Sequence, residues 1–450
     1  MAWHVVIAGG GFAGFYAARS LERKLPRNSA RITIVNDTNF FLYTPLLPGA
    51  AAGTLEPRHV VVPLREALGR TELRLGTVTG AEPDRNCLTV RAHEGRDEDL
   101  FYDHLIVALG SVSRTLPIPG LAEHAIGFKT LAEAIALRNQ VLRCLEYGES
   151  VDDPRERERY LTFVFVGAGY AGVEGLAELQ DFASDTIELY PRCRVQGMRW
   201  ILVEREGRIM PEVRPSLSDF ATTELRRRGI EVRTGTSLEA VTADSATLSG
   251  GEVIPTRTVA WTAGVKPHPV VEHLGLPLER GRIVTDKYCL VQGRENVWAA
   301  GDAAAVPDPA KRREQASPPT AQHGLRQAKV AAHNVAAALG RGRRRAFTYR
   351  TLGVFVDMGR RQAVAQTVGL RWRGPFAWFL ARTYHLALMP GLARRARLLV
   401  DWNVGLFFGR DAAELGGPPT PGLAEHSAGG TGSANGDSAQ SSRRPQAKSS

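Results

Sequence analysis

Two glycine-rich turns in the chain have residue types and spacing that suit the binding of a dinucleotide. Each turn is a short apolar run followed by three glycines: residues 163–166 with Gly167, Gly169 and Gly172, and residues 4–8 with Gly9, Gly11 and Gly14. In such a turn the first glycine permits a tight bend, the second lets a pyrophosphate approach the backbone, and the third lets the next helix pack against the strand. The N-terminus of that helix then faces the anion with free N–H groups. We therefore expect two dinucleotide sites.

A ribose-binding side chain is expected where the second strand of each unit ends. In the first unit this strand ends at Asn36 and Asp37, and either could serve, since an amide also hydrogen-bonds a hydroxyl group. In the second unit the strand 200–204 ends in Glu204. Glu204 lies farther beyond Gly172 than is usual for this fold, so we expect an insertion in the helical region between them. A carboxylate at this place would repel a 2′-phosphate, which favours NADH over NADPH, although the adjacent Arg205 weakens that inference.

The elements that must position these turns are strands alternating with helices. They predict an α/β fold with two Rossmann-like dinucleotide-binding domains, followed by a C-terminal region of antiparallel strands and amphipathic helices. The expected boundaries are 1–118 and 266–345 for the two parts of the first domain, 119–265 for the second domain, 346–410 for a C-terminal membrane-associating or dimerisation region, and 411–450 for a disordered tail rich in Gly, Ser, Pro and Ala.

The segment 375–410 interleaves aromatic residues such as Trp378 and Trp402 with basic ones such as Arg382 and the cluster 394–397. None of its apolar stretches reaches the roughly 20 residues that a spanning helix needs. Amphipathic, basic and aromatic-rich helices suit the interface of an anionic membrane. A dimer interface, or a cap packed on the body of the protein, is the alternative.

Composition limits the remaining classes of function. A net charge of +10 comes from scattered basic clusters, for each of which a solvated face is the commonest explanation, so no nucleic-acid partner is expected. The four cysteines, Cys87, Cys144, Cys193 and Cys289, include no close pair, which argues against a disulfide framework, a zinc knuckle and a redox-active dithiol. The eleven histidines have no ligand spacing, so no metal site is expected. The N-terminus has no signal-peptide pattern, which predicts a cytoplasmic location.

Two glycine turns followed by a late Gly-Asp pair, Gly301-Asp302, resemble the plan of the two-dinucleotide-domain flavoprotein reductases over roughly Trp3 to Leu339. Within that superfamily the chain looks most like the type II NADH:quinone oxidoreductases, which are monotopic, non-pumping NADH dehydrogenases. Three stretches carry this narrower resemblance: Asn-Phe-Phe-Leu-Tyr-Thr-Pro-Leu-Leu at 39–47, Pro-Pro-Thr-Ala-Gln-His-Gly-Leu-Arg-Gln at 318–327, and the aromatic and basic C-terminal segment.

The resemblance implies FAD in the first domain and NAD(H) in the second. The residues it assigns to FAD are Gly9, Gly11, Gly14, Asn36 or Asp37, Thr44 and Pro45 along the flavin, Gly110, and Asp302 at the ribityl-phosphate end. Those it assigns to NADH are Gly167, Gly169, Gly172, Glu204 and Gly264.

The resemblance also implies three catalytic residues. Glu174 would lie where nicotinamide meets flavin, and Gln322 and Arg326 would contact the quinone. The pair Ala321-Gln322 matches the family's quinone-site motif Ala-Gln-x-x-x-Gln. The second glutamine is displaced, because Arg326 stands at its place and Gln327 follows.

The implied reaction passes a hydride from NADH to FAD and then two electrons to a membrane quinone, without proton pumping. The protein would bind an anionic membrane surface through its C-terminal segment, as a peripheral protein on the cytoplasmic side of the cell membrane. Two other functions stay open: a soluble NAD(P)H-dependent reductase of a ferredoxin-like or rubredoxin-like protein, and a flavin-bound NADH sensor. A sulfide:quinone reductase would need a redox cysteine pair.

Overall fold

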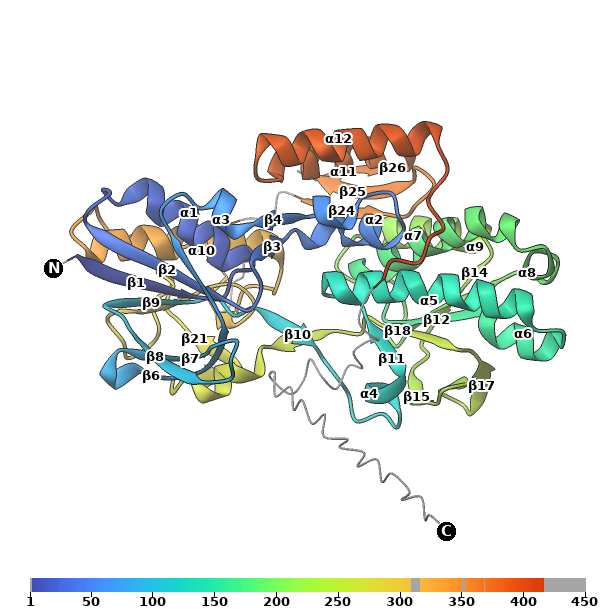
Figure 1. Ribbon diagram of the computed structural model, residues 1–450, viewed down its shortest axis with the longest axis horizontal. Helices are drawn as coiled ribbons and strands as arrows, with labels where there is room; N and C mark the ends of the chain where they lie inside the picture. The colour runs from blue at the N-terminus through green and yellow to red at the C-terminus, as the bar shows by residue number, and fades with distance from the viewer. Residues whose placement is uncertain (1, 309–315, 350–352, 368, 417–450) are drawn as a thin grey trace, which may run out of the picture.

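The computed structural model describes residues 2–308, 316–349, 353–367 and 369–416. Figure 1 shows two α/β bodies at opposite ends of the molecule, with a C-terminal group of strands and helices lying across their junction. The expected α/β fold with two dinucleotide-type domains is confirmed. All of the predicted tail beyond residue 416 lies outside the described residues.

The first domain is built on a parallel five-stranded sheet in the order β22-β9-β1-β2-β5. These strands are Val297–Ala299, His104–Val107, Trp3–Ala8, Ala30–Asn36 and Glu72–Leu75. The pairing of β22 with β9 brings a late part of the chain back to the N-terminal sheet. The first domain therefore contains two separate segments of the sequence.

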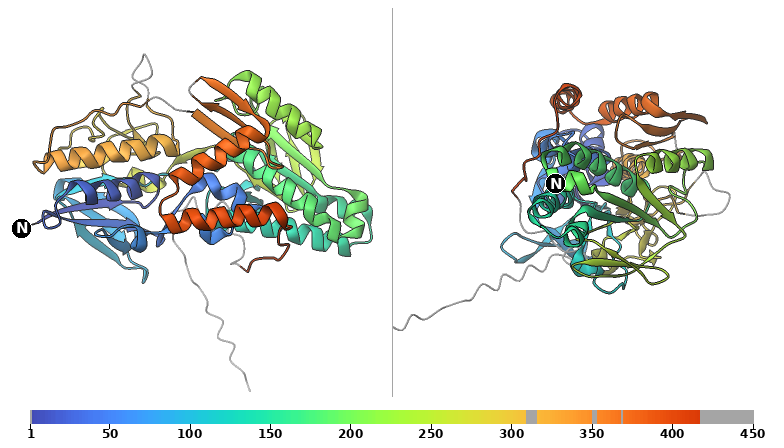
Figure 2. Two further views of the ribbon diagram at one scale, coloured as in Figure 1. Left: turned by 90° about the horizontal axis from the view of Figure 1, so that it is seen from above. Right: turned by 90° about the vertical axis from the view of Figure 1, so that its right-hand side faces the viewer.

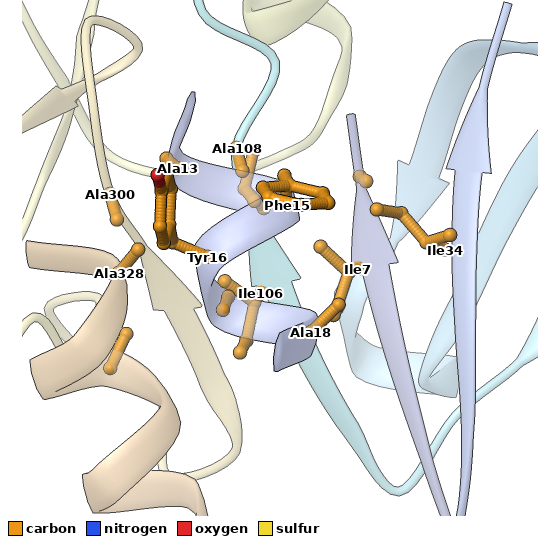
Figure 3. Close-up of a cluster of buried hydrophobic side chains, with 14 of the residues drawn as sticks. Ile7, Ala13, Phe15, Tyr16, Ala18, Ile34, Ile106, Ala108, Ala300 and Ala328 are labelled. Atoms are coloured by element: carbon orange, nitrogen blue, oxygen red, sulfur yellow. The ribbon is translucent and has the colours of Figure 1, made fainter. Parts of the chain in front are cut away.

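The core of this domain lies between its sheet and two helices, α1 (Phe12–Lys24) and α10 (Ala321–Ala338). The last four residues of β1 are fully buried, which requires cover on both faces of the strand. Figure 3 shows how α1 fills one side: Phe15 lies toward the strands, while Ala13 lies on the side where Ala300 and Ala328 are found. Small residues at that contact let α10 pack closely against α1.

The second domain repeats the plan with the parallel sheet β11-β18-β12-β13-β14. Its strands are Ala125–Gly127, Thr258–Trp261, Thr162–Val166, Arg199–Glu204 and Ile230–Thr234, and its longer helices are α5 (Leu131–Ser150), α7 (Tyr170–Thr186) and α9 (Pro215–Arg227). The expected insertion between the second glycine turn and Glu204 is present as the rest of α7, a 3-10 turn Ile187–Leu189 and α8 (Pro191–Gln196).

Smaller elements complete the two domains. The short strand pairs and three-stranded sheets are β3 (Phe40–Leu42) with β4 (Val61–Pro63), β6 (Thr77–Glu82) with β7 (Cys87–Arg91) and β8 (Asp97–Phe101), β15 (Leu238–Val241) with β16 (Ser245–Leu248) and β17 (Glu252–Pro255), and β20 (Leu278–Glu279) with β21 (Arg282–Val284) and β23 (Ala304–Ala305). The short helices are α2 (Leu47–Ala51), α3 (Leu64–Ala67), α4 (Leu121–His124) and α6 (Pro154–Leu161). The antiparallel pair β10 (Ser111–Ser113) and β19 (Val265–Pro267) joins the domains.

Two stretches without a clear periodic pattern also form regular elements. The charged stretch 152–159 contains most of α6: the Asp153 side chain accepts a hydrogen bond from Arg155 N at its start, and Pro154 occupies the first turn. The apolar stretch 39–53 contains β3, a 3-10 turn, Thr44–Leu46, and α2.

The C-terminal region consists of the antiparallel sheet β24 (Gly353–Asp357), β25 (Ala363–Thr367) and β26 (Leu370–Arg373), followed by α11 (Gly374–Leu388) and α12 (Leu392–Phe407). Figure 2 shows α11 and α12 on one face of the molecule, over the junction of the two domains. No helix within the described residues is both long and apolar enough to cross a membrane.

Residues 409–416, here called the strap, run from α12 back to the second domain. Asn139 on α5 exchanges two hydrogen bonds with the backbone of Leu415, and the Arg143 Nε donates to Glu414 Oε1 at 2.7 Å. Arg410 forms an ion pair with Asp181 on α7 at 2.6 Å. Residues 411–416, expected to begin a disordered tail, are therefore bound to the second domain.

Candidate active site between the two domains

The first and third glycines of both turns are required by the protein itself. Gly9 and Gly167 have φ values of 102° and 104°, a conformation that residues with a Cβ rarely adopt. A Cβ on Gly14 would lie 1.7 Å from the carbonyl oxygen of Gly9, and one on Gly172 would lie 1.9 Å from that of Gly167. These four glycines make the tight bend and the close helix packing that the sequence pattern predicts.

The middle glycines, Gly11 and Gly169, have no such explanation within the protein. Their φ values are −71° and −70°, and a Cβ at either position would meet no atom within 4 Å. Open space beside the backbone is what a closely approaching pyrophosphate requires. Both turns therefore fit a dinucleotide phosphate, although neither turn needs its middle glycine in order to fold.

The helices that follow the turns present free N–H groups to the same space. Neither α1 nor α7 has a side-chain hydrogen bond at its N-cap, and neither carries an acidic residue in its first turn. The unsatisfied N–H groups and the positive end of the helix dipole are thus left for a ligand anion.

Asn36 and Glu204 occupy equivalent positions in the two domains. Asn36 Oδ1 accepts a hydrogen bond from Gly10 N at 2.7 Å, and Glu204 Oε2 accepts one from Ala168 N at 2.7 Å. Gly10 and Ala168 are the residues between the first and second glycines of their turns. Asn36, and not Asp37, is therefore the counterpart of Glu204 and the better candidate for the ribose contact in the first domain.

A cavity of about 700 Å³ lies where both domains meet the C-terminal region. The first domain contributes α1, the Thr44–Leu46 turn and α10; the second contributes the start of α7 and the loop after β18; the C-terminal region contributes β24 and the end of α11. Six residues expected in a site line this one cavity: Thr44, Pro45, Glu174, Gly264, Gln322 and Arg326. The turn glycines, Asn36, Asp37, Gly110, Asp302 and Glu204 are not among its lining residues.

Glu174 lies in the second turn of α7 and faces the cavity. By accessible surface the residue is half-buried, and it forms part of the cavity wall. Burial raises the pKa of the Glu174 carboxyl well above its usual range, and the carboxyls of Asp357 and Glu178 act in the same direction. The one opposing contact is a hydrogen bond from Asp357 N to Glu174 Oε1 at 3.0 Å. A carboxyl whose pKa is raised in this way can act as a proton donor inside the cavity.

The side chain of Gln322 on α10 is already bound at both ends. Its Oε1 accepts from the Tyr349 hydroxyl at 2.5 Å and its Nε2 donates to the Gly353 carbonyl at 3.0 Å. Gln322 therefore bridges Tyr349 and Gly353, the first residue of β24.

Arg326, one turn further along α10, lies over the Tyr349 ring at 4.0 Å and donates from Nη1 to the Gln322 carbonyl oxygen. Arg326 also lines the cavity. Gln327 is buried and its Oε1 accepts from Gly301 N at 2.8 Å, so it does not replace a cavity-facing glutamine.

Sequence reasoning did not identify a half-buried chain of polar groups that ends at Asp302. Lys129 Nζ donates to Ser111 Oγ at 2.7 Å, and that hydroxyl donates to Asp302 Oδ2 at 2.5 Å. Lys129 lines the cavity, and burial lowers the pKa of its ammonium group. An isolated lysine before a helix gives no signal of such a role, because Ser111 and Asp302 come from distant segments.

Aromatic residues of the C-terminal region were also missed as cavity residues. Tyr384 stacks on Phe355 with ring centroids 4.8 Å apart, and His385 Nδ1 lies 3.3 Å from the hydroxyl of Tyr43. Burial lowers the pKa of His385 to about 4, so its ring is neutral at physiological pH. These residues give the cavity flat, apolar walls.

Comparisons with known proteins agree with this geometry. A family model described as pyridine nucleotide-disulphide oxidoreductase matches residues 3–333. The chain is 31% identical over 393 residues to a probable NADH dehydrogenase of Dictyostelium discoideum, across 85% of this chain and 86% of that protein. It is 30% identical over 429 residues to the type II NADH:quinone oxidoreductase NdhA of Mycobacterium tuberculosis, across 91% and 88%. The fold matches NDH2 from Plasmodium falciparum in complex with NADH, with a TM-score of 0.84 at 19% identity, over 92% of this chain and 100% of that chain.

Proposed function

The chain belongs to the type II NADH:quinone oxidoreductases, and from that premise we propose that its central cavity serves both halves of the reaction. The protein is a flavoprotein oxidoreductase that uses FAD and NAD(H). Bound FAD would accept a hydride from NADH and supply two electrons to the quinone. The observation that carries the proposal is the single cavity on which both dinucleotide domains and the C-terminal region converge.

The two cofactors are assigned to the domains by their order in the chain. The first turn, with Asn36 and Asp302, would hold FAD, and the second turn, with Glu204, would hold NADH. Thr44 and Pro45 enter the cavity from the first domain, and Gly264 and Glu174 enter it from the second. The protein's task is to hold two ring systems together there and to keep water out.

Glu174 would hold the proton for the reaction. Its position at the contact between domains and its raised pKa suit a carboxyl that gives a proton to the reducing quinone and is then reloaded.

Arg326 is the better candidate for direct contact with the quinone carbonyl. The Gln322 amide is bound to Tyr349 and Gly353, whereas Arg326 uses only one N–H group on the Gln322 carbonyl oxygen among its described contacts. Gln322 would then act by positioning Tyr349 and the strand that carries Phe355.

Rapid-mixing spectroscopy tests this function directly. The FAD-loaded protein is mixed with NADH, and the reduced protein is then mixed with a short-chain quinone. Rapid bleaching and rapid recolouring support the enzyme. Recolouring only by a small redox protein would support the soluble reductase, and slow recolouring with every acceptor would support the sensor.

The C-terminal helices are proposed as the membrane contact. Leu392 is 81% exposed, Phe407 80% and Phe408 70%, which is unfavourable in water for side chains of this size. Arg19, Lys329 and Arg395 line the cavity from α1, α10 and α12 and have no carboxylate partner within the described residues. Apolar side chains beside a basic rim suit an anionic bilayer, from which a quinone could enter. We therefore propose a peripheral location on the cytoplasmic face of the membrane.

A further inference from the structure

Helix α7 carries four carboxylates on one face: Glu174, Glu178, Asp181 and Asp185. Their spacing of four, three and four residues keeps them on the same side of an α-helix, over about 16 Å of its length. Glu174 is at the cavity, Glu178 and Asp181 are buried, and the Asp185 side chain is 61% exposed. The face therefore runs from the central cavity to solvent.

A second, smaller cavity of about 40 Å³ lies directly behind Glu174. Three carboxyl groups line it, those of Glu174, Glu178 and Asp357, together with Thr54, Arg382 and His385. Glu174 and His385 line the central cavity as well. The rest of its wall is largely apolar, but a space of this size beside several polar groups has room for a water between side chains that do not touch. The Thr54 hydroxyl lies 3.3 Å from Glu178 Oε2 and gives one fixed partner inside it.

The charges around these carboxyls come from every element packed against them. Arg410 of the strap pairs with Asp181 at 2.6 Å and lies 4.0 Å from both Glu178 and Asp185. The other groups are Arg382 on α11, Arg228 after α9, Arg360 and Arg361 after β24, and neutral His385. No three ligand side chains in the described part of the chain are arranged to hold a metal ion. The cluster is thus a set of acids with arginine counter-charges.

The protonation state changes along the helix face. Burial raises the pKa of Glu178, and burial together with Glu178 raises the pKa of Asp357 to about 7. Burial also acts to raise the pKa of Asp181, but Arg410 outweighs it and the pKa of that carboxyl lies below its usual range. The inner acids therefore take up a proton more readily than free carboxyls, whereas Asp181 favours its ionised form.

The proposed reaction consumes one proton from the medium for each turnover. NADH, one proton and a quinone give NAD⁺ and a hydroquinone: the hydride brings two electrons and one hydrogen, and the second hydrogen must arrive as a proton. In the proposed membrane-bound state the cavity opens toward lipid, so this proton needs a route from the aqueous side of the protein.

We propose that the acidic face of α7 is this route, with Asp185 and Asp181 at the solvent end and Glu178 and Asp357 as the proton store that reloads Glu174 through the small cavity. This inference rests on the proposed function. Asp357 and Glu178 act through Glu174 and do not touch the quinone; they are positioning residues for the proton.

The variant Asp357→Asn tests the role of Asp357 in the proton store with little change in the shape of the side chain. Asn Oδ1 can keep the hydrogen bond that Asp357 Oδ1 accepts from Gly359 N, but the side chain can no longer release a proton. Asp219→Asn, an exposed acid on α9, is the matched control. Each protein is loaded with FAD, reduced with NADH, and reoxidised with a short-chain quinone between pH 5.5 and 9.

We expect NADH reduction to be unchanged in Asp357→Asn and quinone reoxidation to be at least tenfold slower. The wild-type reoxidation rate should fall with an apparent pKa near 7, and this transition should be absent in Asp357→Asn, present in Asp219→Asn, and restored in Asp357→Glu. Glu178→Gln should also slow reoxidation and should raise its solvent deuterium isotope effect.

The proposal is overturned if Asp357→Asn and Glu178→Gln both keep the wild-type rate, pH profile and isotope effect while Glu174→Gln slows reoxidation. In that case the proton reaches Glu174 by another path and the proposed function stands. If Glu174→Gln itself behaves as wild type, the proposed role of the cavity fails first.

Discussion

Gly169 is the residue at which the requirement of the fold and the requirement of the ligand can be separated. Its φ of −70° suits any residue, and a Cβ would point into empty space. Gly167, two residues earlier, has a φ of 104° and would place a Cβ 2.6 Å from the backbone nitrogen of Ala263. A methyl group therefore disturbs the fold at Gly167, and at Gly169 it disturbs only what binds there.

We expect Gly169→Ala to raise the KM for NADH at least tenfold while the melting temperature stays within about 1 °C of wild type. Steady-state kinetics and thermal unfolding with FAD bound measure the two effects. Gly167→Ala is the contrasting variant, because the strain at positive φ and the clash should lower its melting temperature by several degrees. An unchanged NADH KM in Gly169→Ala would show that the second turn does not hold the pyrophosphate.

Arg326 stands where the family's quinone-site motif has its second glutamine, so substitutions of Arg326 test that position. A charged hydrogen bond to a quinone carbonyl is worth about 1.5–3 kcal/mol, which corresponds to roughly ten- to a hundredfold in affinity. We expect Arg326→Ala to raise the quinone KM by at least tenfold, and Arg326→Gln, which restores the motif, to recover part of that loss.

The rate of flavin reduction by NADH should be the same in both Arg326 variants, since this step precedes quinone binding. That rate is the internal control. A quinone KM that does not move in Arg326→Ala would remove the arginine from the quinone site.

The sequence predicted well the features that depend on neighbours in the chain. Glycine spacing, the strand ending in Glu204 and the helix carrying Glu174 are local patterns, and the structure places them as elements in the way that was expected. The roles of Lys129, His385 and Arg410 were not predictable, because their partners are 18 to 342 residues away along the chain. The choice of Asn36 over Asp37 as the candidate for the ribose contact depended on the hydrogen bond that Asn36 accepts from Gly10 N, which only the structure shows.

At the scale of elements, α11, α12 and the strap connect the surface to the buried acids. α11 presents Phe379, which is 60% exposed, and carries Arg382 beside the small cavity. The strap leaves α12 and places Arg410 between Asp181 and Glu178. One proposed membrane helix, α11, and the strap that follows α12 therefore supply two of the positive charges around the acidic face of α7.

The exposed end of α12 gives the test of membrane attachment. Burying a phenylalanine side chain in an apolar phase contributes about 1.5–3 kcal/mol. The double variant Phe407→Asp, Phe408→Asp loses this contribution and adds two negative charges. We expect its binding to phosphatidylglycerol-containing vesicles, measured by co-sedimentation, to fall at least tenfold, with turnover of a water-soluble quinone unchanged.

Ala413→Asp, at an exposed position of the strap and outside α12, controls for added charge. Vesicle binding that persists in the Phe407, Phe408 double variant would assign these side chains to another contact. A change from dimer to monomer in that variant, measured by light scattering, would identify that contact as a homodimer interface.

At the scale of the whole molecule, the buried acids couple folding to pH. The pKa of Asp357 is about 7 in the folded protein, against about 3.9 for an aspartate in an unfolded chain. A carboxyl whose pKa is raised by folding contributes stability that is fully present below the unfolded pKa and is lost as the pH rises through the folded pKa. Glu174 and Glu178 act in the same direction, since burial raises the pKa of both. Asp181, whose pKa is lowered, affects stability only at more acidic pH.

The protein should therefore be more resistant to urea at pH 6 than at pH 8. For one carboxyl with a pKa of about 7, the loss over this interval is about 1.4 kcal/mol, because one pKa unit corresponds to about 1.4 kcal/mol. Asp357→Asn removes that carboxyl, so its difference in unfolding free energy between pH 6 and pH 8 should be smaller than that of wild type by about this amount. Asp219→Asn should keep the full difference. If Asp357→Asn also kept it, Asp357 would be ionised over the whole range in the folded protein, and it could not be the proton store for Glu174.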